Sequence, residues 1–370
     1  MNTALLVGSG FSIELGIPLI TEISKKLKNF YSRERFSPVF ERWIKEGFKG
    51  LSQETMDEFY NILEEHNINY EEIIGSLEDL YNKNKPPKRD EYWGLLGRVN
   101  EYLSFIFIRY HLNLEQILDS ITLYEGFKKL AENLKPIWIF TLNHDLVIEI
   151  IASEFKIPLS DGLGKNVRNI ILDSTKIPLK FYPISDLNEN KMTLSESGDY
   201  GINLIKIHGS LGLYTCFDNK FISKLTSKEH SARAWIELLL KINYLLKPPG
   251  LPKAVNEIMY MDEKNQIQFL QRTLLSGTHK FENRNLHQTP SHFLRLFKRK
   301  IEDFRNLLII GYGFKDFHIN EVVEKWFQED KNRTVEIVDP FLYKIPKIFQ
   351  NSKNRVRFTK KSTTEYLKSL

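Results

Sequence analysis

Short apolar segments, each followed by a glycine-rich or polar turn, constrain the fold of this chain more than any other feature of its sequence. Five such segments recur along the chain, at 3–7, 137–141, 203–207, 307–310 and 334–338. Runs of four or five apolar residues are typical of strands buried on both faces, as in a parallel sheet. The pattern therefore predicts an α/β fold, in which a Rossmann-like parallel sheet carries helices on both faces.

Segments with helical periodicity separate the expected strands. We expect helices at about 20–31, 146–155 and 318–329, and largely helical stretches at 55–82, 91–134 and 225–305. Two interruptions of these stretches are expected, one near 67–69 and one at 247–250. For the chain as a whole, we expect a catalytic domain over 1–345 with helical insertions at about 50–134 and 225–305, followed by a basic C-terminal segment at 346–370.

Composition argues against several classes of protein. The formal net charge is only +5, which does not indicate a dedicated nucleic-acid binder, so any contact with nucleic acid would be indirect. Cys216 is the single cysteine, so this sequence can form neither an internal disulfide nor a four-cysteine zinc site, and no metal is expected. No apolar run approaches the roughly 20 residues that span a membrane, and no signal peptide is apparent. We therefore expect a cytoplasmic protein without a membrane partner.

A glycine-rich segment follows the first expected strand. It comprises Gly8, Ser9, Gly10, Phe11 and Ser12 and continues to Gly16 and Pro18. Glycine allows a positive φ and a close approach of the backbone to a phosphate, which suits a nucleotide-binding turn. Ile13 stands where the G-x-G-x-x-G fingerprint has its third glycine, so a plain structural turn explains the spacing equally well.

Polar side chains follow the next two expected strands. Asn143 and Asp145 come after 137–141, and His208 comes after 203–207. Because ligands of parallel α/β sheets bind at the carboxyl ends of the strands, we expect these three side chains to share one site. Asn143 can orient a ribose or a water, Asp145 can bind a carboxamide or shape the turn, and His208 can act as a base near neutral pH. Ordinary turn formation and a structural histidine are the alternatives that spacing alone leaves open.

The last two expected strands end in a similar way. They are followed by Gly311, Tyr312 and Gly313, with Asp316 nearby, and by Asp339. A glycine turn at this place can form part of a ligand loop, and a carboxylate at a late strand end suits a ribose diol. A plain turn and a helix cap are the alternatives.

The order of these motifs resembles that of the sirtuin superfamily, over residues 3 to about 340. The resemblance implies that the glycine-rich segment, with its trailing Gly16-Ile17-Pro18, holds the phosphates and ribose of NAD. It also implies that Asn143, Asp145 and His208 line the nicotinamide–ribose pocket. The expected contacts with the adenosine half are Gly311, Tyr312, Gly313 and Asp339.

Two departures from sirtuin deacylases change the expected activity. Deacylases carry a four-cysteine zinc ribbon between the His-Gly segment and the next glycine motif, whereas this chain has Cys216 alone. They also carry an aromatic-Arg pair soon after the Gly-Ile-Pro segment, where this chain has Leu19-Ile20. The chain, including its segment 69–74, thus resembles the zinc-free sirtuin-like branch, whose members include NAD-hydrolysing effectors of bacterial anti-phage systems.

The resemblance implies an NAD+ glycohydrolase, with NAD as substrate and no metal. Asn143 would bind the ribose hydroxyls or the attacking water, His208 would activate a hydroxyl or that water, and Asp145 would anchor the carboxamide. Two alternatives stay open: a non-catalytic sensor or scaffold that binds NAD or ADP-ribose and, with less support, an NAD-dependent protein deacylase.

Regulation is expected as well, because uncontrolled loss of NAD would harm the host cell. We expect a homo-oligomer whose activity stays low until it is assembled or triggered. By the same resemblance, a HerA-like hexameric ATPase is a candidate partner, with an Argonaute-like or nucleic-acid-triggered partner as the alternative.

Overall fold

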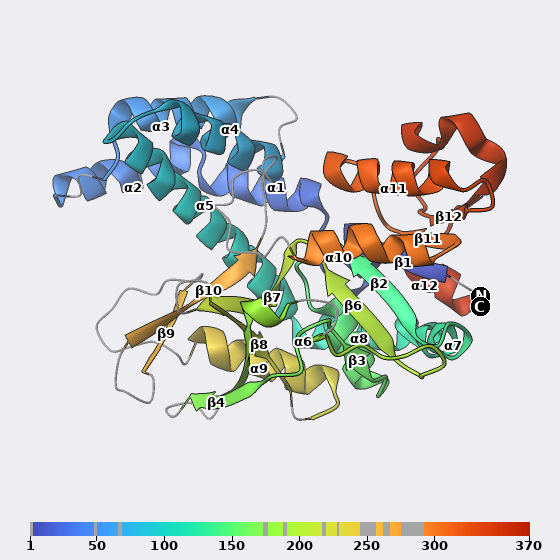
Figure 1. Cartoon of the computed structure of the whole chain (residues 1–370). Helices are drawn as coiled ribbons and strands as arrows, with labels where there is room; N and C mark the ends of the chain where they lie inside the picture. Colours follow the sequence, from blue (N-terminus) through green and yellow to red (C-terminus); the bar gives the residue numbers. More distant parts are fainter. Residues whose placement is uncertain are drawn as a thin grey trace.

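The computed structural model describes residues 3–47, 50–65, 69–172, 177–187, 191–216, 220–227, 229–244, 257–261, 267–274 and 292–370. Figure 1 shows a central sheet, a lobe of helices to one side of it and a second sheet below that lobe. The two termini lie close together at the far side of the central sheet.

A parallel sheet of seven strands forms the centre, in the order β13-β12-β11-β1-β2-β6-β3. Its strands are β1 (Thr3–Val7), β2 (Ile137–Thr141), β3 (Leu159–Ser160), β6 (Ile202–Lys206), β11 (Asn306–Ile310), β12 (Thr334–Val338) and β13 (Val356–Thr359). All neighbouring strands in it are parallel. The expected strands correspond to β1, β2, β6, β11 and β12, with small shifts at β6 and β11, so the predicted Rossmann-like sheet is confirmed.

Helices cover both faces of this sheet. Alternate residues of a strand point to opposite faces, and β1 accordingly supplies two separate cores. Leu5 and Val7 pack in one core with α1 (Ile20–Phe30), α5 (Lys88–His111) and α8 (Val147–Glu154). Ala4 and Leu6 pack in the other core with α10 (His292–Lys300) and α11 (Phe317–Glu329). The helix-covered parallel sheet predicted from the apolar runs is therefore what the chain forms.

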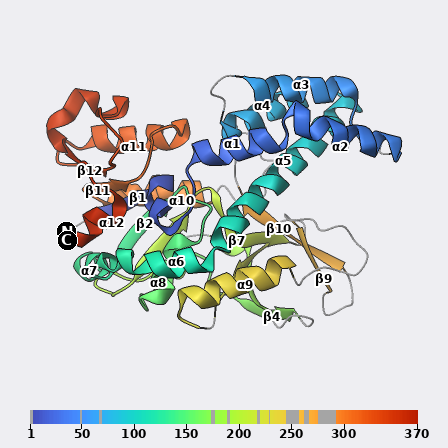
Figure 2. The same cartoon turned by 180° about the vertical axis from the view of Figure 1, so that it is seen from behind.

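The helical lobe consists of α1, α2 (Arg33–Lys45), α3 (Gln53–Glu64), α4 (Tyr70–Lys83) and the first part of α5. Figures 1 and 2 show that α5 runs from this lobe down to the sheets. Two shorter helices follow it, α6 (Leu114–Ile121) and α7 (Gly126–Asn133). The expected interruption near 67–69 falls at the start of α4, where Asn69 and Glu72 form a capping box, although 67 and 68 lie outside the described residues.

A second sheet, of antiparallel strands, was not expected from the sequence. Its order is β4-β5-β8-β7-β10-β9. The strands are β4 (Arg168–Leu172), β5 (Ile177–Pro183), β7 (Gly209–Cys216), β8 (Phe221–Leu225), β9 (Glu257–Met261) and β10 (Ile267–Leu274). The strands of an antiparallel sheet form their backbone hydrogen bonds with neighbouring strands. The sequence of one short segment carries little information about such pairing.

The stretch 225–305 was expected to be helical, and this expectation is wrong in part. α9 (Ala232–Tyr244) and α10 are helices, but β9 and β10 are strands that pair with each other. β10 also pairs with β7, which follows His208 directly in the chain. Pairing with β7 is a tertiary contact that overrides local propensity. The expected break at 247–250 lies outside the described residues.

The C-terminal residues continue the central fold. η6 (Lys347–Arg355) leads into β13, which pairs with β12, and α12 (Thr363–Lys368) follows with a capping box at Ser362. Glu14 binds this turn, since its carboxylate accepts hydrogen bonds from the Ser362 hydroxyl at 2.7 Å and the Thr364 hydroxyl at 2.6 Å. The C-terminal segment is thereby brought against the glycine-rich segment.

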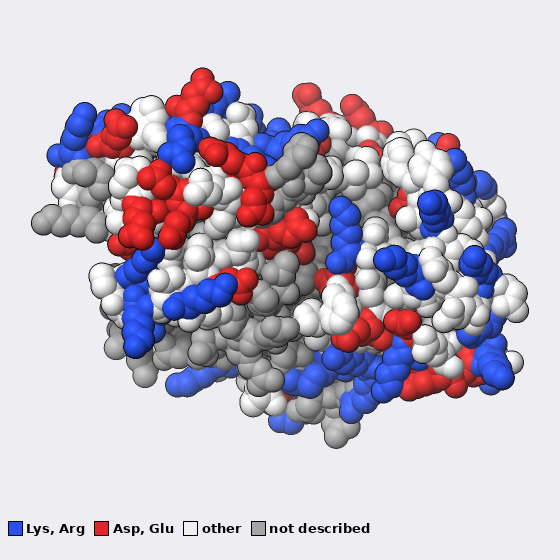
Figure 3. All heavy atoms as spheres, turned by 90° about the horizontal axis from the view of Figure 1, so that it is seen from above, with Lys and Arg blue, Asp and Glu red and all other residues white. Residues whose placement is uncertain are grey.

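The surface carries charges of both signs. On the face seen in Figure 3, acidic side chains gather over the helical lobe among Lys and Arg, and side chains of both signs are also present over the rest of the face. Within the described residues, no helix is both long enough and apolar enough to cross a membrane.

Two glycine turns meet backbone to backbone at the carboxyl ends of β1 and β11. The Gly10 N–H donates to the Gly311 carbonyl at 2.9 Å, and the Gly8 N–H donates to the Ile310 carbonyl at 3.0 Å. A Cβ on Gly311 would lie 2.4 Å from the Phe11 amide nitrogen. Gly311 also has a φ of 62°, in the left-handed region that other residues rarely adopt. The two turns can therefore touch only because Gly10 and Gly311 have no side chains.

His111 ties the end of α5 to the turn after β2. Its Nδ1 lies 2.7 Å from the Phe107 carbonyl, and its Nε2 accepts a hydrogen bond from the Leu146 N–H at 2.9 Å. Accepting at Nε2 requires the neutral imidazole with its proton on Nδ1. Folding lowers the pKa of His111. Burial is the main cause, and the charge of Lys206 acts in the same direction, whereas the charge of Asp145 raises the pKa.

Replacing Gly311 by Ala is expected to lower the free energy of unfolding by at least about 2 kcal/mol, because left-handed strain and a backbone clash add. Urea unfolding followed by circular dichroism measures this change. Gly313→Ala is the matched control, since a Cβ there meets nothing within 4 Å, and it should change stability by less than about 0.5 kcal/mol. Equal stability of the two variants would contradict the argument.

The stability of the folded chain is expected to fall as the pH drops from 7.5 to 5, in part through His111. The ordinary pKa of this histidine is 6.5 and folding lowers it. Its contribution to stability is therefore complete above that value and is lost as the pH falls towards the folded-state pKa. Urea midpoints at several pH values test this against His111→Gln, whose amide oxygen can still accept but does not titrate. Burial also lowers the pKa of His292, to about 4, and this effect is present in the unmodified chain and in His111→Gln alike. If stability depends on pH in the same way in both proteins, a contribution from His111 is excluded.

Candidate functional site

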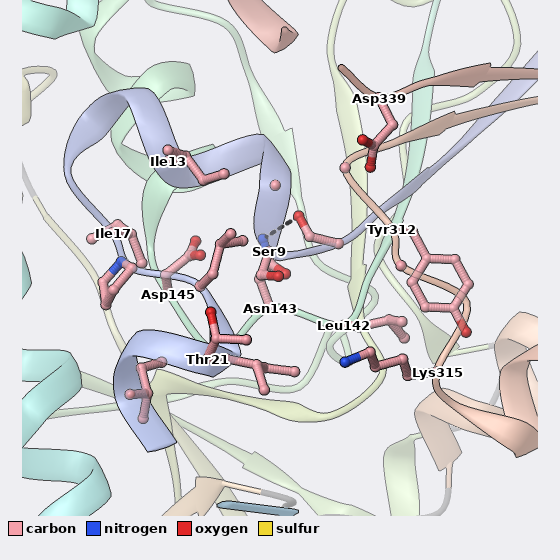
Figure 4. A pocket seen from close by; sticks show the side chains of 18 of the residues that line it. Ser9, Ile13, Ile17, Thr21, Leu142, Asn143, Asp145, Tyr312, Lys315 and Asp339 are labelled. Atoms are coloured by element: carbon pink, nitrogen blue, oxygen red, sulfur yellow. Dashed lines mark hydrogen bonds between the residues drawn. The ribbon is translucent and has the colours of Figure 1, made fainter. Parts of the chain in front are cut away.

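A cavity of about 490 Å³ lies at the carboxyl ends of β1, β2, β11 and β12, and the helical lobe closes one side of it. The predicted site residues that line it are Gly8, Ser9, Gly10, Pro18, Asn143, Asp145, His208, Gly311, Tyr312, Gly313 and Asp339. Figure 4 shows Ser9 on one wall, Asn143 and Asp145 beside it and Asp339 on the opposite wall. The strand ends thus bring together motifs that lie far apart in the sequence, as expected for a parallel sheet.

The glycine-rich segment forms a short 3-10 helix, η1 (Ser9–Leu15), rather than an open loop. Some of its amides are already used within the protein: Gly10 donates to Gly311, and Phe11 donates to the Gly8 carbonyl at 3.0 Å. Ser9 lies at the start of η1 and lines the cavity. The start of η1 is therefore the part of this segment that is best placed to meet a ligand.

Three predicted residues of this segment do not line the cavity. Phe11 is fully buried and packs against Tyr124, whose hydroxyl donates to the Phe11 carbonyl at 2.5 Å. Gly16 ends η1 in the left-handed conformation, with a φ of 83°. Ser12 is buried behind the wall, and its hydroxyl donates to Asp145 Oδ2 at 2.8 Å. These residues support the site from behind.

Asn143 is held by the turn after β1. Its Nδ2 donates to the Gly8 carbonyl at 3.0 Å and to the Ser12 hydroxyl at 3.3 Å. Its own N–H donates to the Thr141 hydroxyl at 3.1 Å. The residue is 8% exposed, so the protein determines the orientation of its side chain before any ligand arrives.

Asp145 is also anchored through both of its oxygens. Oδ2 accepts from Ser12, and Oδ1 accepts from the Val147 N–H at 3.1 Å, at the start of α8. The Lys206 ammonium contacts the Asp145 carbonyl and lies 3.2 Å from Glu149 Oε1. These bonds favour the interpretation that Asp145 shapes the turn, although a carboxylate can accept further hydrogen bonds.

His208 lies at the end of β6 and faces a carboxylate. Its Nε2 is 3.3 Å from Asp316 Oδ2, and the two side chains are 4% and 7% exposed. The ring of His144 lies nearby, with its centroid 6.2 Å from that of His208. His208 and Asp316 thus lie within ion-pair distance of each other, and both line the cavity.

The turn after β11 forms the opposite wall. Tyr312 is buried, and its hydroxyl donates to Asn320 Oδ1 at 2.9 Å. Burial raises the pKa of Tyr312, so this hydroxyl stays neutral. At the end of β12, Asp339 Oδ1 accepts from the N–H groups of Phe341 and Leu342, at 2.7 and 3.0 Å.

Several residues of the wall were missed by the sequence analysis, namely Glu14, Tyr70, Glu71, Lys315, Ser362 and Thr363. Lys315 directly follows the third glycine motif, and Figure 4 shows its side chain extending into the cavity. It is the single Lys or Arg among the described residues that line the cavity. Its position after Gly311-Tyr312-Gly313 could have marked it, whereas nothing in the sequence brings 362–363 to this place.

One family model and several solved structures are similar to this chain. A family model described as a SIR2-like domain matches residues 138–364. The chain is similar to the structure of Sir2Tm bound to a propionylated peptide, with 13% identity and a TM-score of 0.40, over 100% of this chain and 91% of that one. It is also similar to a Sir2 homolog in complex with NAD, with 13% identity and a TM-score of 0.42, over 99% and 86% of the two chains. No curated protein matches the sequence.

The glycine turns, the polar strand ends and the cavity between them all belong to one parallel α/β fold. The matched region begins in β2, includes His208 and the Gly311 turn, and ends in α12. Because it comprises more than half of the chain, the chain belongs to the SIR2-like domain family.

Proposed function

We propose that this chain is an NAD+ glycohydrolase, which cleaves the nicotinamide–ribose bond and releases nicotinamide and ADP-ribose. The observation that carries the proposal is that Asn143, Asp145 and His208 line one cavity beside a glycine turn, in a chain of the SIR2-like family. NAD is the substrate, and the proposed reaction needs no metal.

The adenosine half of NAD would contact the wall formed by Gly311, Tyr312, Gly313 and Asp339. The Oδ1 atom of Asp339 already accepts from two backbone N–H groups. Its Oδ2 is then the oxygen that can accept hydrogen bonds from a ribose diol.

The pyrophosphate would lie at the start of η1, near Ser9. A helix start presents N–H groups and a partial positive charge, which stabilise an anion. Since the amides of Gly10 and Phe11 donate within the protein, the proposed contacts with the pyrophosphate narrow to the Ser9 N–H and the Lys315 ammonium. Pro18 lines the same side of the cavity and would contact the bound dinucleotide.

At the nicotinamide ribose, water would replace nicotinamide at the anomeric carbon. The carbon–nitrogen bond breaks with its electron pair passing to neutral nicotinamide, the water oxygen forms the new bond, and a proton is released. Asn143 would hold the ribose hydroxyls or the water, and His208 would accept the proton. Help from a general base typically contributes about 10² to 10⁴ in rate. The anchored turn of Asp145 would keep the carboxamide end in place.

Two other functions make different predictions. A protein deacylase needs a channel for an acyl-lysine, and the zinc ribbon that accompanies it in deacylases cannot form with Cys216 alone. A non-catalytic sensor would bind NAD or ADP-ribose and leave it intact. A sensor has no need of a base paired with a carboxylate, which counts in favour of catalysis.

The biological setting that we propose is bacterial anti-phage defence, in which the enzyme depletes NAD after a trigger. The enzyme would act as a homo-oligomer, and a HerA-like ATPase encoded nearby is the proposed partner. Control by assembly is proposed because an unregulated enzyme of this kind would harm its own cell.

Asn143→Ala and His208→Ala are expected to reduce NAD hydrolysis by at least about 10²-fold, because each removes a group that acts on the reacting ribose. Chromatography of nicotinamide and ADP-ribose measures the activity, and thermal unfolding checks that the fold is kept. Asn29→Ala and His230→Ala are matched controls, since both residues are exposed and lie outside the cavity. Normal hydrolysis by either cavity variant would exclude the roles assigned here, and NAD that binds but stays intact in the unmodified protein would favour the sensor.

Assembly with the neighbouring ATPase is expected to raise the rate of NAD hydrolysis by about tenfold or more, a typical size for coupling between sites. The rate is measured for the isolated chain and for the mixture, and light scattering follows the size of the particles. Strong hydrolysis by an isolated monomer would contradict control by assembly and leave the glycohydrolase proposal intact.

A further inference from the structure

Three large aromatic side chains are exposed near the carboxyl ends of β11 and β12. Phe317 and Phe341 are each 67% exposed, and Tyr343 is 78% exposed. Single exposed apolar side chains are common and need no explanation by themselves. Phe341 differs from the other two because it also lines the cavity. A ligand that fills this end of the cavity would therefore contact Phe341 and remove part of its apolar surface from water.

The turn that carries Phe341 is held by the carboxylate of Asp339. Asp339 Oδ1 accepts hydrogen bonds from the N–H groups of Phe341 and Leu342, at 2.7 and 3.0 Å. The N–H of Asp339 donates to the Thr359 carbonyl at the end of β13, at 3.2 Å. Pro340 stands between the two cavity residues, and its ring restricts its own φ. The backbone of Asp339 is thus fixed relative to that of Phe341.

A carboxylate beside an aromatic ring suits a nucleoside. The carboxylate can accept hydrogen bonds from a ribose diol, and the face of the ring can stack on a base. Ribose and base are joined directly in a nucleoside, so the groups that hold them must be neighbours in the protein. Asp339 and Phe341 meet this requirement, since both line the cavity and the turn uses Oδ1 of the carboxylate.

Phe341 lies at the end of the cavity that is remote from Asn143. In the central sheet, β11 and β1 lie between β12 and β2. Neighbouring strands are about 4.8 Å apart, so the carboxyl ends of β12 and β2 are separated by about 14 Å. Phe341 follows β12 and Asn143 follows β2. A ligand that contacts both residues must therefore be extended, as a dinucleotide is.

We propose that Phe341 is a substrate-binding residue, on whose ring the adenine of NAD stacks while Asp339 Oδ2 accepts from the attached ribose. The proposal rests on the proposed function and deepens it, because it names the group that holds the base. Stacking at this end of the cavity touches none of the reacting atoms. Phe341 therefore governs how tightly the dinucleotide binds and leaves the chemical step unchanged.

Two variants separate stacking from simple apolar contact. Phe341→Leu keeps an apolar side chain without a ring, and Phe341→Trp supplies a larger ring. Tyr343→Leu is the matched control, because it removes a more exposed ring from the same loop but outside the cavity. Calorimetry measures the affinity for ADP-ribose, chromatography measures NAD hydrolysis, and NMR follows the adenine H2 and H8 signals of bound ADP-ribose. Thermal unfolding checks that each variant is folded.

Phe341→Leu is expected to weaken ADP-ribose binding and to raise KM for NAD by at least about fivefold, the lower end of what stacking of a base on an aromatic ring contributes. Its kcat should be unchanged. In the unmodified chain the ring should shift the bound adenine protons upfield, and Phe341→Leu should lose this shift. Phe341→Trp should bind ADP-ribose at least as tightly as the unmodified chain, and Tyr343→Leu should behave like the unmodified chain in every measurement.

Equal affinity for ADP-ribose in the unmodified chain and in Phe341→Leu would overturn the proposal. A loss of affinity without any change in the adenine shifts would also overturn it, because Phe341 would then act through apolar bulk alone. Failure of the unmodified chain to bind ADP-ribose has the same consequence. If the unmodified chain binds ADP-ribose but does not cleave NAD, the proposed function fails, while the affinities and the adenine shifts still decide whether the base stacks on Phe341.

Discussion

The meeting of two glycine turns is the contact on which the rest of the site depends. Gly10 and Gly311 touch through their backbones, and the hydrogen bond between them joins the ends of β1 and β11. Without that approach, η1 would not start at the edge of the cavity, and the loop that carries Asp316 would not face His208. The sheet provides the platform, but the absence of two side chains determines how closely its loops come together.

A polar network joins the turns at the ends of β1 and β2. Ser12 links Asn143 to Asp145, and the Asn143 amide reaches back to the turn after β1. Lys206 and Glu149 support this network from β6 and α8, where both are almost fully buried. Because a buried polar group is costly unless it is bonded, these side chains stabilise one arrangement of the turn and disfavour others.

Part of the cavity wall comes from segments that the sequence analysis did not assign to the site. The helical lobe contributes Tyr70 and Glu71 at the capped start of α4, and the C-terminal segment contributes Ser362 and Thr363. Glu14 fastens the latter to η1 through the hydroxyls of the capping turn. These contacts give the cavity walls that a bare Rossmann-like sheet lacks.

The sequence alone determined the parallel sheet, because buried strands have a strong apolar signal. It also predicted a site at the carboxyl ends of the strands, where ligands of such sheets bind. It singled out Asn143, His208 and the glycine turns as candidates, and the structure brings them to one cavity. Only the tertiary structure decided that β9 and β10 are strands, that Phe11, Ser12 and Gly16 stand behind the cavity, and that Asp316 meets His208. The physical reason is that pairing between distant strands and contacts between side chains depend on the whole chain in three dimensions, whereas periodicity and turn chemistry are local.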